Sequence, residues 1–370
     1  MATCKSASLF ATSSSALETT YMETGNIALD MALTNGKGLP MGKYVILTAE
    51  QGSGKTTTCV DLIKRLCNKH IAASIPFKMM FLDIEGSQEL ARKMGLGPLI
   101  DNGSLLYKDG PCTFEDLDQM ATDIANGAPF YDGLKVIIID SLTMIKSEQE
   151  VSSEKGDFGN ATRARNKFYK IFLSELKRKG ITLISISQVR VKQGATAYED
   201  PKKSAITDGD LHYADIILKL AKTTGGNNAE TKKKDIKVTT SDKTEKLSPN
   251  FFVSYKPYGD KNRYGHFPAV TTLVKYSVGC DNWYIMREIL SHYKYLVNKG
   301  TATYPKFVMS DELTGYVGVE FPVESDKKTM KKYLRENMGA IKDFLRSKDE
   351  YRLVPDDILA SEDDEDYDDE

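Results

Sequence analysis

The chain has 370 residues, of which 41% are hydrophobic and 28% charged, and its formal net charge is −2. This composition is ordinary for a globular protein, and the length suffices for one large domain and a small one. No run approaches the roughly 18 apolar residues of a membrane helix, and Met1–Ser15 lacks the apolar segment of a signal peptide. The five cysteines include no C-x-x-C pair, which argues against disulfides and zinc and favours a reducing compartment, the cytoplasm (that of the host if the protein is viral).

Short apolar runs alternate with amphipathic stretches through the first half of the chain. Residues 1–21 carry one apolar patch, Leu9-Phe10, which we interpret as part of a polymerisation arm or of a disordered terminus. The expected elements that follow are helix 27–33, strand 44–48, helix 55–67, strand 78–84, a helix start at 89–94, helix 113–126, strand 135–140, helix 163–179 and strand 181–187. Strands alternating with helices predict an α/β fold with a mostly parallel sheet covered on both faces.

The later part of the chain has weaker patterns. Residues 191–209 are polar, as is typical of a functional or disordered loop, and 225–248 favour an exposed hairpin or loop. Strands are expected at 251–255 and 269–276, and a charged helix at 327–346. We divide the chain into an N-terminal segment (1–21), a core (22–293), a small C-terminal domain (294–355) and an acidic disordered tail (356–370).

The strongest motif follows strand 44–48 and opens the next helix: Ala49-Glu-Gln-Gly-Ser-Gly-Lys55-Thr56. In a phosphate-binding loop, glycines let backbone N–H groups turn toward phosphate oxygens, and the helix N-terminus adds positive potential. Lys55 would neutralise the β- and γ-phosphates, and the Thr56 hydroxyl would bind Mg²⁺. The motif departs from its usual form at the first position, where Ala49 replaces glycine. The predicted nucleotide-binding residues are Gly52, Ser53, Gly54, Lys55, Thr56 and Thr57.

Two further carboxylates lie at the ends of apolar strands. Asp140 ends the run that starts at Lys135, and ligands of open α/β sheets bind at the carboxyl ends of strands. We therefore expect Asp140 to hold Mg²⁺ through water. Glu85 is the candidate that orients or deprotonates the attacking water in ATP hydrolysis. Asp83 competes for that role, and the alternative is that Glu85 is an ordinary surface glutamate.

Basic residues gather in and around helix 163–179. Three of them fall at i, i+4 and i+7 on one face, which is either a solvated face or a DNA-binding one. The two loops near this helix carry cations and aromatic residues that suit a single-stranded backbone. The DNA-binding candidates are Phe158, Arg163, Lys167, Lys170, Arg190, Lys192, Lys202 and Lys203. Gln188, just before the second loop, could bind the γ-phosphate and report its presence to that loop.

The charge of the chain is unevenly distributed. Residues 362–370 contain eight acidic groups and one tyrosine. Without these eight, the 52 acidic residues become 44 against 50 basic ones, a balance of +6. This pattern indicates a polyanion ligand with which the tail competes, or a tail that only solubilises the protein.

Together these motifs resemble those of the RecA recombinase family. The segment from Thr24 to Leu33 and the one from Gly38 to Gly42 are similar to the region before the phosphate loop of bacterial RecA. The match continues in order through Phe81–Glu85, Ala91–Gly95, Val136–Ser141 and Ile186–Arg190. It covers about residues 22–292, whereas 294–355 do not match. With its acidic tail, the chain looks most like the RecA-type recombinases of large tailed phages.

The resemblance implies a recombinase that uses ATP and Mg²⁺, forms a head-to-tail helical filament on single-stranded DNA and pairs it with double-stranded DNA. It implies that Lys55, Thr56 and Asp140 bind nucleotide and magnesium, that Glu85 is catalytic and that Gln188 senses the γ-phosphate. Gly159–Arg163 matches the end of the family's first DNA-binding loop, and Arg190 starts the second. Lys261 and Arg263 lie where the family places basic groups that reach the neighbouring subunit's ATP. A single-strand-binding protein and a loading mediator are further expected partners.

Two other functions stay open at this point. A hexameric helicase motor has the same fold and also hydrolyses ATP, but its subunits close into a ring. A regulatory filament-forming protein would not need hydrolysis. The joint presence of Lys55, Thr56, Glu85 and Asp140 argues against the regulatory alternative.

Overall fold

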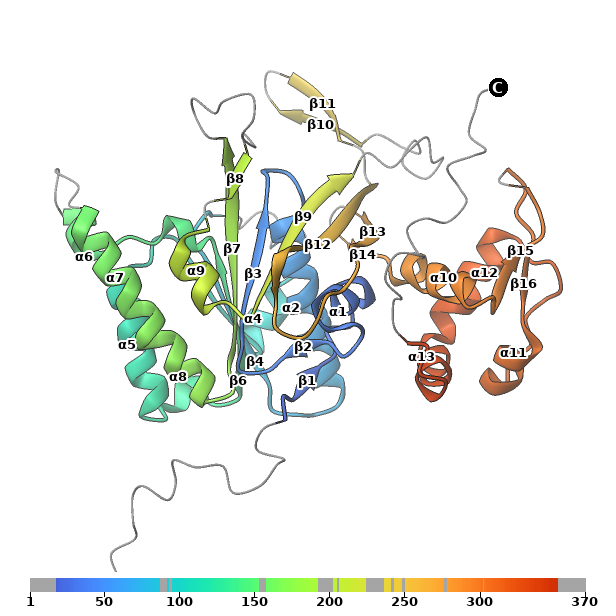
Figure 1. Cartoon of the computed structure of the whole chain (residues 1–370), viewed down its shortest axis with the longest axis horizontal. Helices are drawn as coiled ribbons and strands as arrows, with labels where there is room; N and C mark the ends of the chain where they lie inside the picture. Colours follow the sequence, from blue (N-terminus) through green and yellow to red (C-terminus); the bar gives the residue numbers. More distant parts are fainter. Residues whose placement is uncertain are drawn as a thin grey trace, which may run out of the picture.

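A ten-stranded sheet runs through the centre of the protein (Figure 1). The structure, a computed structural model, describes residues 18–86, 92, 95–152, 158–191, 202–204, 206–223, 236–240, 243–247, 250–275, 278–301 and 303–351. The strand order is β14 (Gly279–Cys280), β13 (Val270–Lys275), β12 (Asn250–Asn262), β9 (Ile216–Thr223), β3 (Tyr44–Ala49), β7 (Thr182–Val191), β6 (Leu134–Asp140), β4 (Lys78–Asp83) and β5 (Leu105–Asp109), with β8 (Lys202–Ser204) paired to β7. The strands from β9 to β5 are parallel and the remaining pairs antiparallel, which confirms the predicted α/β fold with a mostly parallel sheet.

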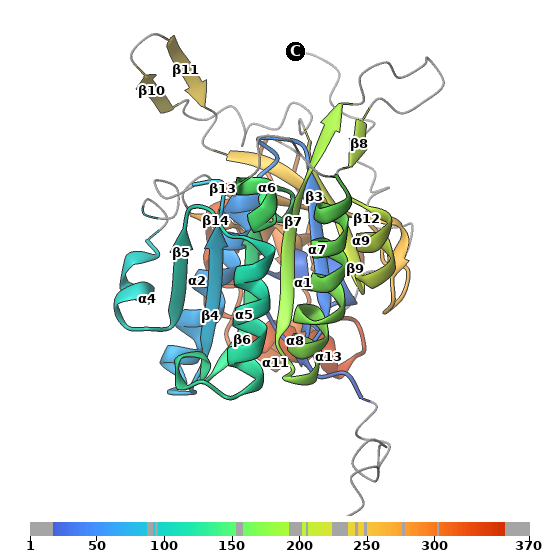
Figure 2. The same cartoon turned by 90° about the vertical axis from the view of Figure 1, so that its left-hand side faces the viewer.

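Helices cover both faces of the sheet because its central strands are apolar on both sides. Val45 and Leu47 of β3 belong to a core that contains α1 (Ile27–Thr34) and α2 (Lys55–Ala72). Tyr44 and Ile46, which point to the opposite face, belong to a second core. That core is completed by α5 (Phe114–Ala125), α7 (Phe158–Lys170) and α8 (Phe172–Arg178), which Figure 2 shows lying over the sheet.

Capping residues set several helix ends. Asn26 accepts a hydrogen bond from the Leu29 N–H at the start of α1. Thr113 and Asp116 cap each other's backbone N–H groups at the start of α5. A short polar sequence therefore fixes where each of these helices begins.

The two long helices of the sequence analysis are each divided. Helix 163–179 bends at Ile171 between α7 and α8, although backbone hydrogen bonds continue on both sides of the bend. Helix 327–346 consists of α12 (Lys327–Glu336) and α13 (Met338–Ser347). Asn337 separates them, because its side-chain amide donates to the Tyr333 carbonyl and competes with continued helix.

The stretches predicted as loops contain more regular structure than expected. β7 runs past residue 187 to Val191, and α9 (Asp208–Tyr213) begins inside the stretch 191–209. Phe158, expected in a loop, is the first residue of α7. The expected hairpin at 225–248 is present as β10 (Ile236–Thr240) and β11 (Lys243–Leu247). Leu9-Phe10, all of 89–94 except Arg92, and the tail 356–370 lie outside the described residues.

The C-terminal part is mainly helical and packs beside α1. Its side chains share one core with α1, and the chain's division at residue 293 stays a prediction. Its elements are α10 (Asn282–His292), β15 (Leu296–Asn298), β16 (Phe307–Met309), α11 (Asp311–Val317), α12 and α13. The remaining short elements are β1 (Tyr21–Met22), β2 (Leu39–Pro40), α4 (Gly97–Asp101), α6 (Glu148–Ser152) and two 3-10 turns (Pro129–Tyr131 and Leu142–Met144). Among the helices of the described residues, none combines the length and the hydropathy needed to cross a bilayer.

Candidate functional site

The phosphate-binding motif lies where the sequence predicts it, between the end of β3 and the start of α2. Gly52 and Gly54 have φ of 76° and 86°, which a residue with a side chain rarely adopts. A Cβ at Gly54 would also approach the Phe251 ring to 3.0 Å. Ala49 is still in β3 and pairs in register with Gln188, so its backbone is extended and needs no glycine. This explains why alanine is compatible with the first position of the motif.

Lys55 points its ammonium group back into the phosphate loop. Its Nζ donates to the carbonyl oxygens of Ala49 at 3.3 Å and Glu50 at 2.9 Å, and the residue is 7% exposed. Burial lowers the pKa of Lys55, while the carboxylates of Asp140 and Glu85 act in the opposite direction. A phosphate anion at this loop would replace weak carbonyl partners of the ammonium group by a full negative charge.

Thr56 and Asp140 meet across the gap between α2 and β6. The Thr56 hydroxyl donates to Oδ2 of Asp140 at 2.7 Å. The other carboxylate oxygen, Oδ1, is buried and has no hydrogen-bond partner among the residues that the structure describes. Burial, followed by the charges of Glu85 and Asp83, raises the pKa of Asp140 to about 6. A hydroxyl and a carboxylate with one unpaired oxygen form a donor set that suits Mg²⁺, which prefers oxygen ligands and keeps several waters.

Glu85 and Asp83 occupy different environments although only one residue separates them. Asp83 is fully buried; it accepts hydrogen bonds from the Tyr107 hydroxyl at 2.7 Å and the Gly86 N–H at 3.1 Å. Glu85 is exposed, its backbone N–H donates to the Asp140 carbonyl at 3.1 Å, and its carboxylate accepts from the Gln188 amide. Glu85 is therefore the carboxylate that water can reach.

The basic face predicted on α7 is only partly free. Arg163 and Lys170 are exposed, whereas Lys167 forms an ion pair with Asp118 of α5. That carboxylate raises the pKa of Lys167. Phe158 is the first residue of this helix.

The second group of DNA-binding candidates lies on a hairpin. β7 and β8 pair antiparallel, with Arg190 opposite Lys203 and Val191 opposite Lys202. The hairpin extends beyond the neighbouring strands at the carboxyl end of the sheet, the end that carries the phosphate loop (Figure 1). Lys192 lies outside the described residues.

A buried network that the sequence analysis missed lies beneath this hairpin. Asp210 of α9 forms an ion pair with Arg165 at 2.8 Å and accepts from the Tyr169 hydroxyl, both on α7. The Tyr44 hydroxyl at the start of β3 contacts Asp210 at 3.4 Å. Burial and the Asp210 charge raise the pKa of Tyr169 to about 12. The only local signal was the capping pattern of Thr207 and Asp210.

Lys261 and Arg263 lie far from the phosphate loop of their own chain. Arg263 forms an ion pair at 3.1 Å with Asp215, which precedes β9 and is hydrogen-bonded to Tyr44 at the start of β3. The phosphate loop follows the other end of β3, about 17 Å away at the usual rise per strand residue. The structure thus separates these two cations from Lys55, Asp140 and Glu85.

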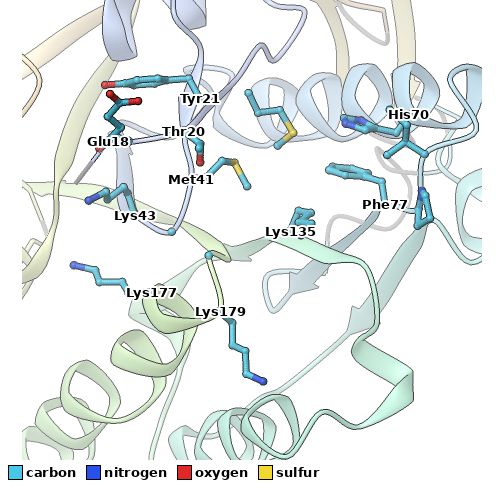
Figure 3. A pocket seen from close by; sticks show the side chains of 16 residues that line it. Glu18, Thr20, Tyr21, Met41, Lys43, His70, Phe77, Lys135, Lys177 and Lys179 are labelled. Carbon is cyan, nitrogen blue, oxygen red and sulfur yellow. The ribbon is translucent and has the colours of Figure 1, made fainter. Parts of the chain in front are cut away.

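The same amino end of the sheet carries a lysine-lined groove of ≈ 680 Å³. The residues that line it include four lysines, one glutamate and several apolar side chains. The charged ones are Lys43, Lys135, Lys177, Lys179 and Glu18. The ammonium groups of Lys43 and Lys177 lie at one end of the groove, and Lys179 points away from them (Figure 3). This end of the sheet is therefore rich in cations, whereas carboxylates cluster at the phosphate-loop end.

The chain is similar to known proteins of one family. A family model of the RecA N-terminal domain matches residues 4–254. The protein RecA of Wigglesworthia glossinidia brevipalpis is 29% identical over 203 residues, 54% of this chain and 57% of that protein. The chain thus aligns with little more than half the length of this curated relative. Because the matched domain covers most of the chain and includes the phosphate loop, Glu85, Asp140 and Gln188, this protein belongs to the RecA family.

Proposed function

We propose that this protein is an ATP-dependent DNA recombinase that assembles head to tail on single-stranded DNA and pairs it with homologous duplex. The observation that carries the proposal is the course of β7. This one strand contains Gln188, whose amide contacts Glu85, and from the next residue, Val189, it forms the hairpin that carries Arg190. A change at the γ-phosphate would therefore reach a DNA-binding element through a single rigid strand.

ATP and Mg²⁺ fit the site at the carboxyl end of the sheet. Lys55 and the loop N–H groups would hold the phosphates, and Thr56 and Asp140 would hold the ion, which supplies charge neutralisation when bound. Glu85 would orient the attacking water, because it is the exposed carboxylate next to Asp140. Gln188 would exchange its contact with Glu85 for one with the γ-phosphate.

The cations at the other end of the subunit support a head-to-tail assembly. Lys261 and Arg263 are about 17 Å of strand away from their own phosphate loop, so they would serve the nucleotide of a neighbour. Two complementary half-sites at opposite ends of one subunit form a heterologous interface, which builds an open helix or a ring. Filament formation would then be required for hydrolysis.

Joint-molecule formation tests this function. The protein, ATP and Mg²⁺ are incubated with circular single-stranded DNA and homologous linear duplex, and products are separated on a gel while filaments are imaged by electron microscopy. We expect joint molecules that require ATP and homology, and extended helical filaments. Closed rings that unwind duplex DNA without pairing would favour a helicase motor instead.

A further inference from the structure

Asp215 is a buried carboxylate that the phosphate site does not use. It is 2% exposed and lies at the amino end of the sheet, between β9 and the turn that follows β12. Its Oδ2 accepts from the Tyr44 N–H at 2.9 Å, and its Oδ1 accepts from Arg263 at 3.1 Å. Its backbone carbonyl also accepts from the Arg263 N–H at 3.1 Å. The arginine is thus held at both its backbone and its guanidinium group by one residue.

A further cation joins this carboxylate. Lys177, at the end of α8, forms an ion pair with Oδ2 of Asp215 at 3.2 Å. Lys261 lies close enough to be affected by the same charges: partial burial lowers its pKa most, and the positive charges of Arg263 and Lys177 lower it further. Two cations therefore pair with this carboxylate, and a third lies within their electrostatic reach.

The charged groups of this cluster remain accessible from outside. The side chain of Arg263 is 55% exposed and that of Lys177 33%, whereas the Asp215 side chain is 3% exposed. A buried carboxylate that anchors exposed cations fixes the geometry of those cations before an anion arrives. The excess positive charge makes a polyanion the complementary ligand.

We propose that Asp215 is a positioning residue that holds Arg263 for the triphosphate bound by the next subunit, and that Lys177 is a third cation of this cluster beside Lys261. This inference rests on the proposed function, since it requires the two half-sites to meet between subunits. Lys177 enters the cluster from α8, an element that the sequence resemblance does not connect with the nucleotide. The ligand class is the polyphosphate of a nucleoside triphosphate with its developing γ-phosphoryl charge.

The test is the Asp215→Asn substitution in the full-length chain. Asparagine keeps an acceptor for the Tyr44 N–H but removes the charge that holds the cations. Because nucleotide is bound mainly by the phosphate loop, kcat of the DNA-dependent ATPase should fall by about 10- to 100-fold while KM for ATP stays within about threefold. In an Arg263→Ala/Lys177→Met background the same substitution should cost less than about threefold, because both cations that pair with Asp215 are already absent. If Asp215→Asn lowers kcat in that background by the same factor as in the wild type, Asp215 acts only through the fold. That result would overturn the positioning role.

Lys177→Met and Lys179→Met form the matched pair for the third cation. Both lysines are at the end of α8 and line the same groove, but only Lys177 contacts Asp215. Lys177→Met should lower kcat about tenfold or more, and Lys179→Met should leave it unchanged. Equal rates for both variants would show that Lys177 has no role in hydrolysis. This pair of variants also tests the proposal if Asp215→Asn does not fold. A normal rate for Lys261→Ala/Arg263→Ala would sink the intersubunit role that the proposed function gives to this pair, whereas an inactive double variant with a normal Asp215→Asn would sink only this inference.

Discussion

At the scale of single residues, burial separates two carboxylates that the sequence alone presents as equivalent candidates. Asp83 and Glu85 both follow the same apolar run, but Asp83 faces the interior and accepts two hydrogen bonds there. Glu85 is exposed beside Asp140 and Gln188. Tyr107, which occupies one oxygen of Asp83, is 24 residues away in the chain. No local pattern could have shown that one carboxylate is already committed to the fold.

The first prediction follows from this difference. Glu85→Gln should bind ATP and DNA normally but lower kcat by about 10² to 10⁴, because the amide retains the contact with Gln188 and cannot serve as a base. Steady-state ATPase assays with single-stranded DNA measure this effect. Asp83→Asn is the matched control: it should reduce the free energy of unfolding by about 1–3 kcal/mol, through a buried donor left without an acceptor, with a smaller effect on kcat. A turnover of Glu85→Gln within about threefold of wild type would transfer the role to another residue.

The raised pKa of Asp140 predicts a pH dependence of Mg²⁺ binding. The pKa is about 6, so the carboxyl group gains a proton as the pH falls through that value and loses its charge for the ion. In the protein without metal the ionised form is disfavoured by burial, so this group stabilises the fold less as pH rises from about 4 to 6. Above this pKa, bound Mg²⁺ should offset the loss of folding stability that the buried charge causes. The rise in melting temperature caused by Mg²⁺ and ADP should therefore be larger at about pH 7.5 than at about pH 5, where roughly tenfold fewer carboxylates are ionised.

Asp140→Asn provides the control, because the ADP phosphates also titrate in this range. In that variant the rise in melting temperature caused by Mg²⁺ and ADP should no longer depend on the protonation of residue 140. Only the pH dependence due to the nucleotide should remain. An unchanged pH dependence in Asp140→Asn would mean that Asp140 does not hold the ion.

At the scale of elements, the sequence predicts those whose signals are local. Strands 44–48, 78–84 and 135–140 are buried apolar runs, and the structure confirms all three in nearly the predicted positions. β9 was not predicted, although its Ile-Ile-Leu-Lys-Leu run has the same local signal. α9 has only six residues, too few for a helical period, and its start is set by the reciprocal caps of Thr207 and Asp210.

The parts of the site that depend on distant contacts could not be predicted. Lys55, Thr56, Asp140 and Glu85 were identified because each sits at the end of a strand or the start of a helix, and register brings those ends together. Asp215 gave no such signal, because its partners Tyr44 and Arg263 are 171 and 48 residues away in sequence. The ion pair between Lys167 and Asp118 likewise depends on how α7 packs against α5.

The course of β7 leads to a prediction for the hairpin. Arg190→Ala should weaken binding to single-stranded DNA of any sequence, and the slope of log affinity against log salt should become shallower by about 0.7, the value for one phosphate contact on a single strand. Fluorescence anisotropy with labelled oligonucleotides at several salt concentrations measures both quantities. Lys332→Ala, which removes one exposed cation from α12, should change neither. A salt slope that Arg190→Ala leaves at the wild-type value would exclude Arg190 from the DNA contacts.

At the scale of the whole molecule, the uneven distribution of charge predicts that the acidic tail competes with DNA. The tail 362–370 concentrates eight acidic residues in a chain whose remainder has a balance of +6. Removing residues 361–370 should tighten binding to duplex DNA, most strongly at low salt, because salt screens the repulsion between tail and phosphates. The same affinity at every ionic strength would leave the tail with a solubilising role only. The comparison requires the truncated and full-length chains at equal protein concentration.

The opposite placement of the two half-sites yields the most demanding prediction. Glu85→Gln subunits keep Lys261 and Arg263 but lack the carboxylate proposed to be catalytic, and Lys261→Ala/Arg263→Ala subunits have the reverse defect. Each variant alone should be nearly inactive, since an arginine-finger-like group can contribute about 10³ to 10⁵ in rate. In a head-to-tail filament formed from equal amounts of the two variants, an intact interface needs two different subunits. The Lys261→Ala/Arg263→Ala subunit must lie on the nucleotide side and the Glu85→Gln subunit on the cation side.

Random copolymerisation makes such interfaces about a quarter of the total, so mixing should restore ATPase activity to about that fraction of wild type. The measurement is a titration of one inactive variant with the other at constant total protein and saturating single-stranded DNA. Activity should peak at equal amounts, because the probability of an intact interface is the product of the two fractions. Electron microscopy must show that the mixed protein still forms filaments. If filaments form and every mixture stays inactive, the two cations act within their own subunit or only in folding, and the separation of about 17 Å between the half-sites would need a large conformational change to close.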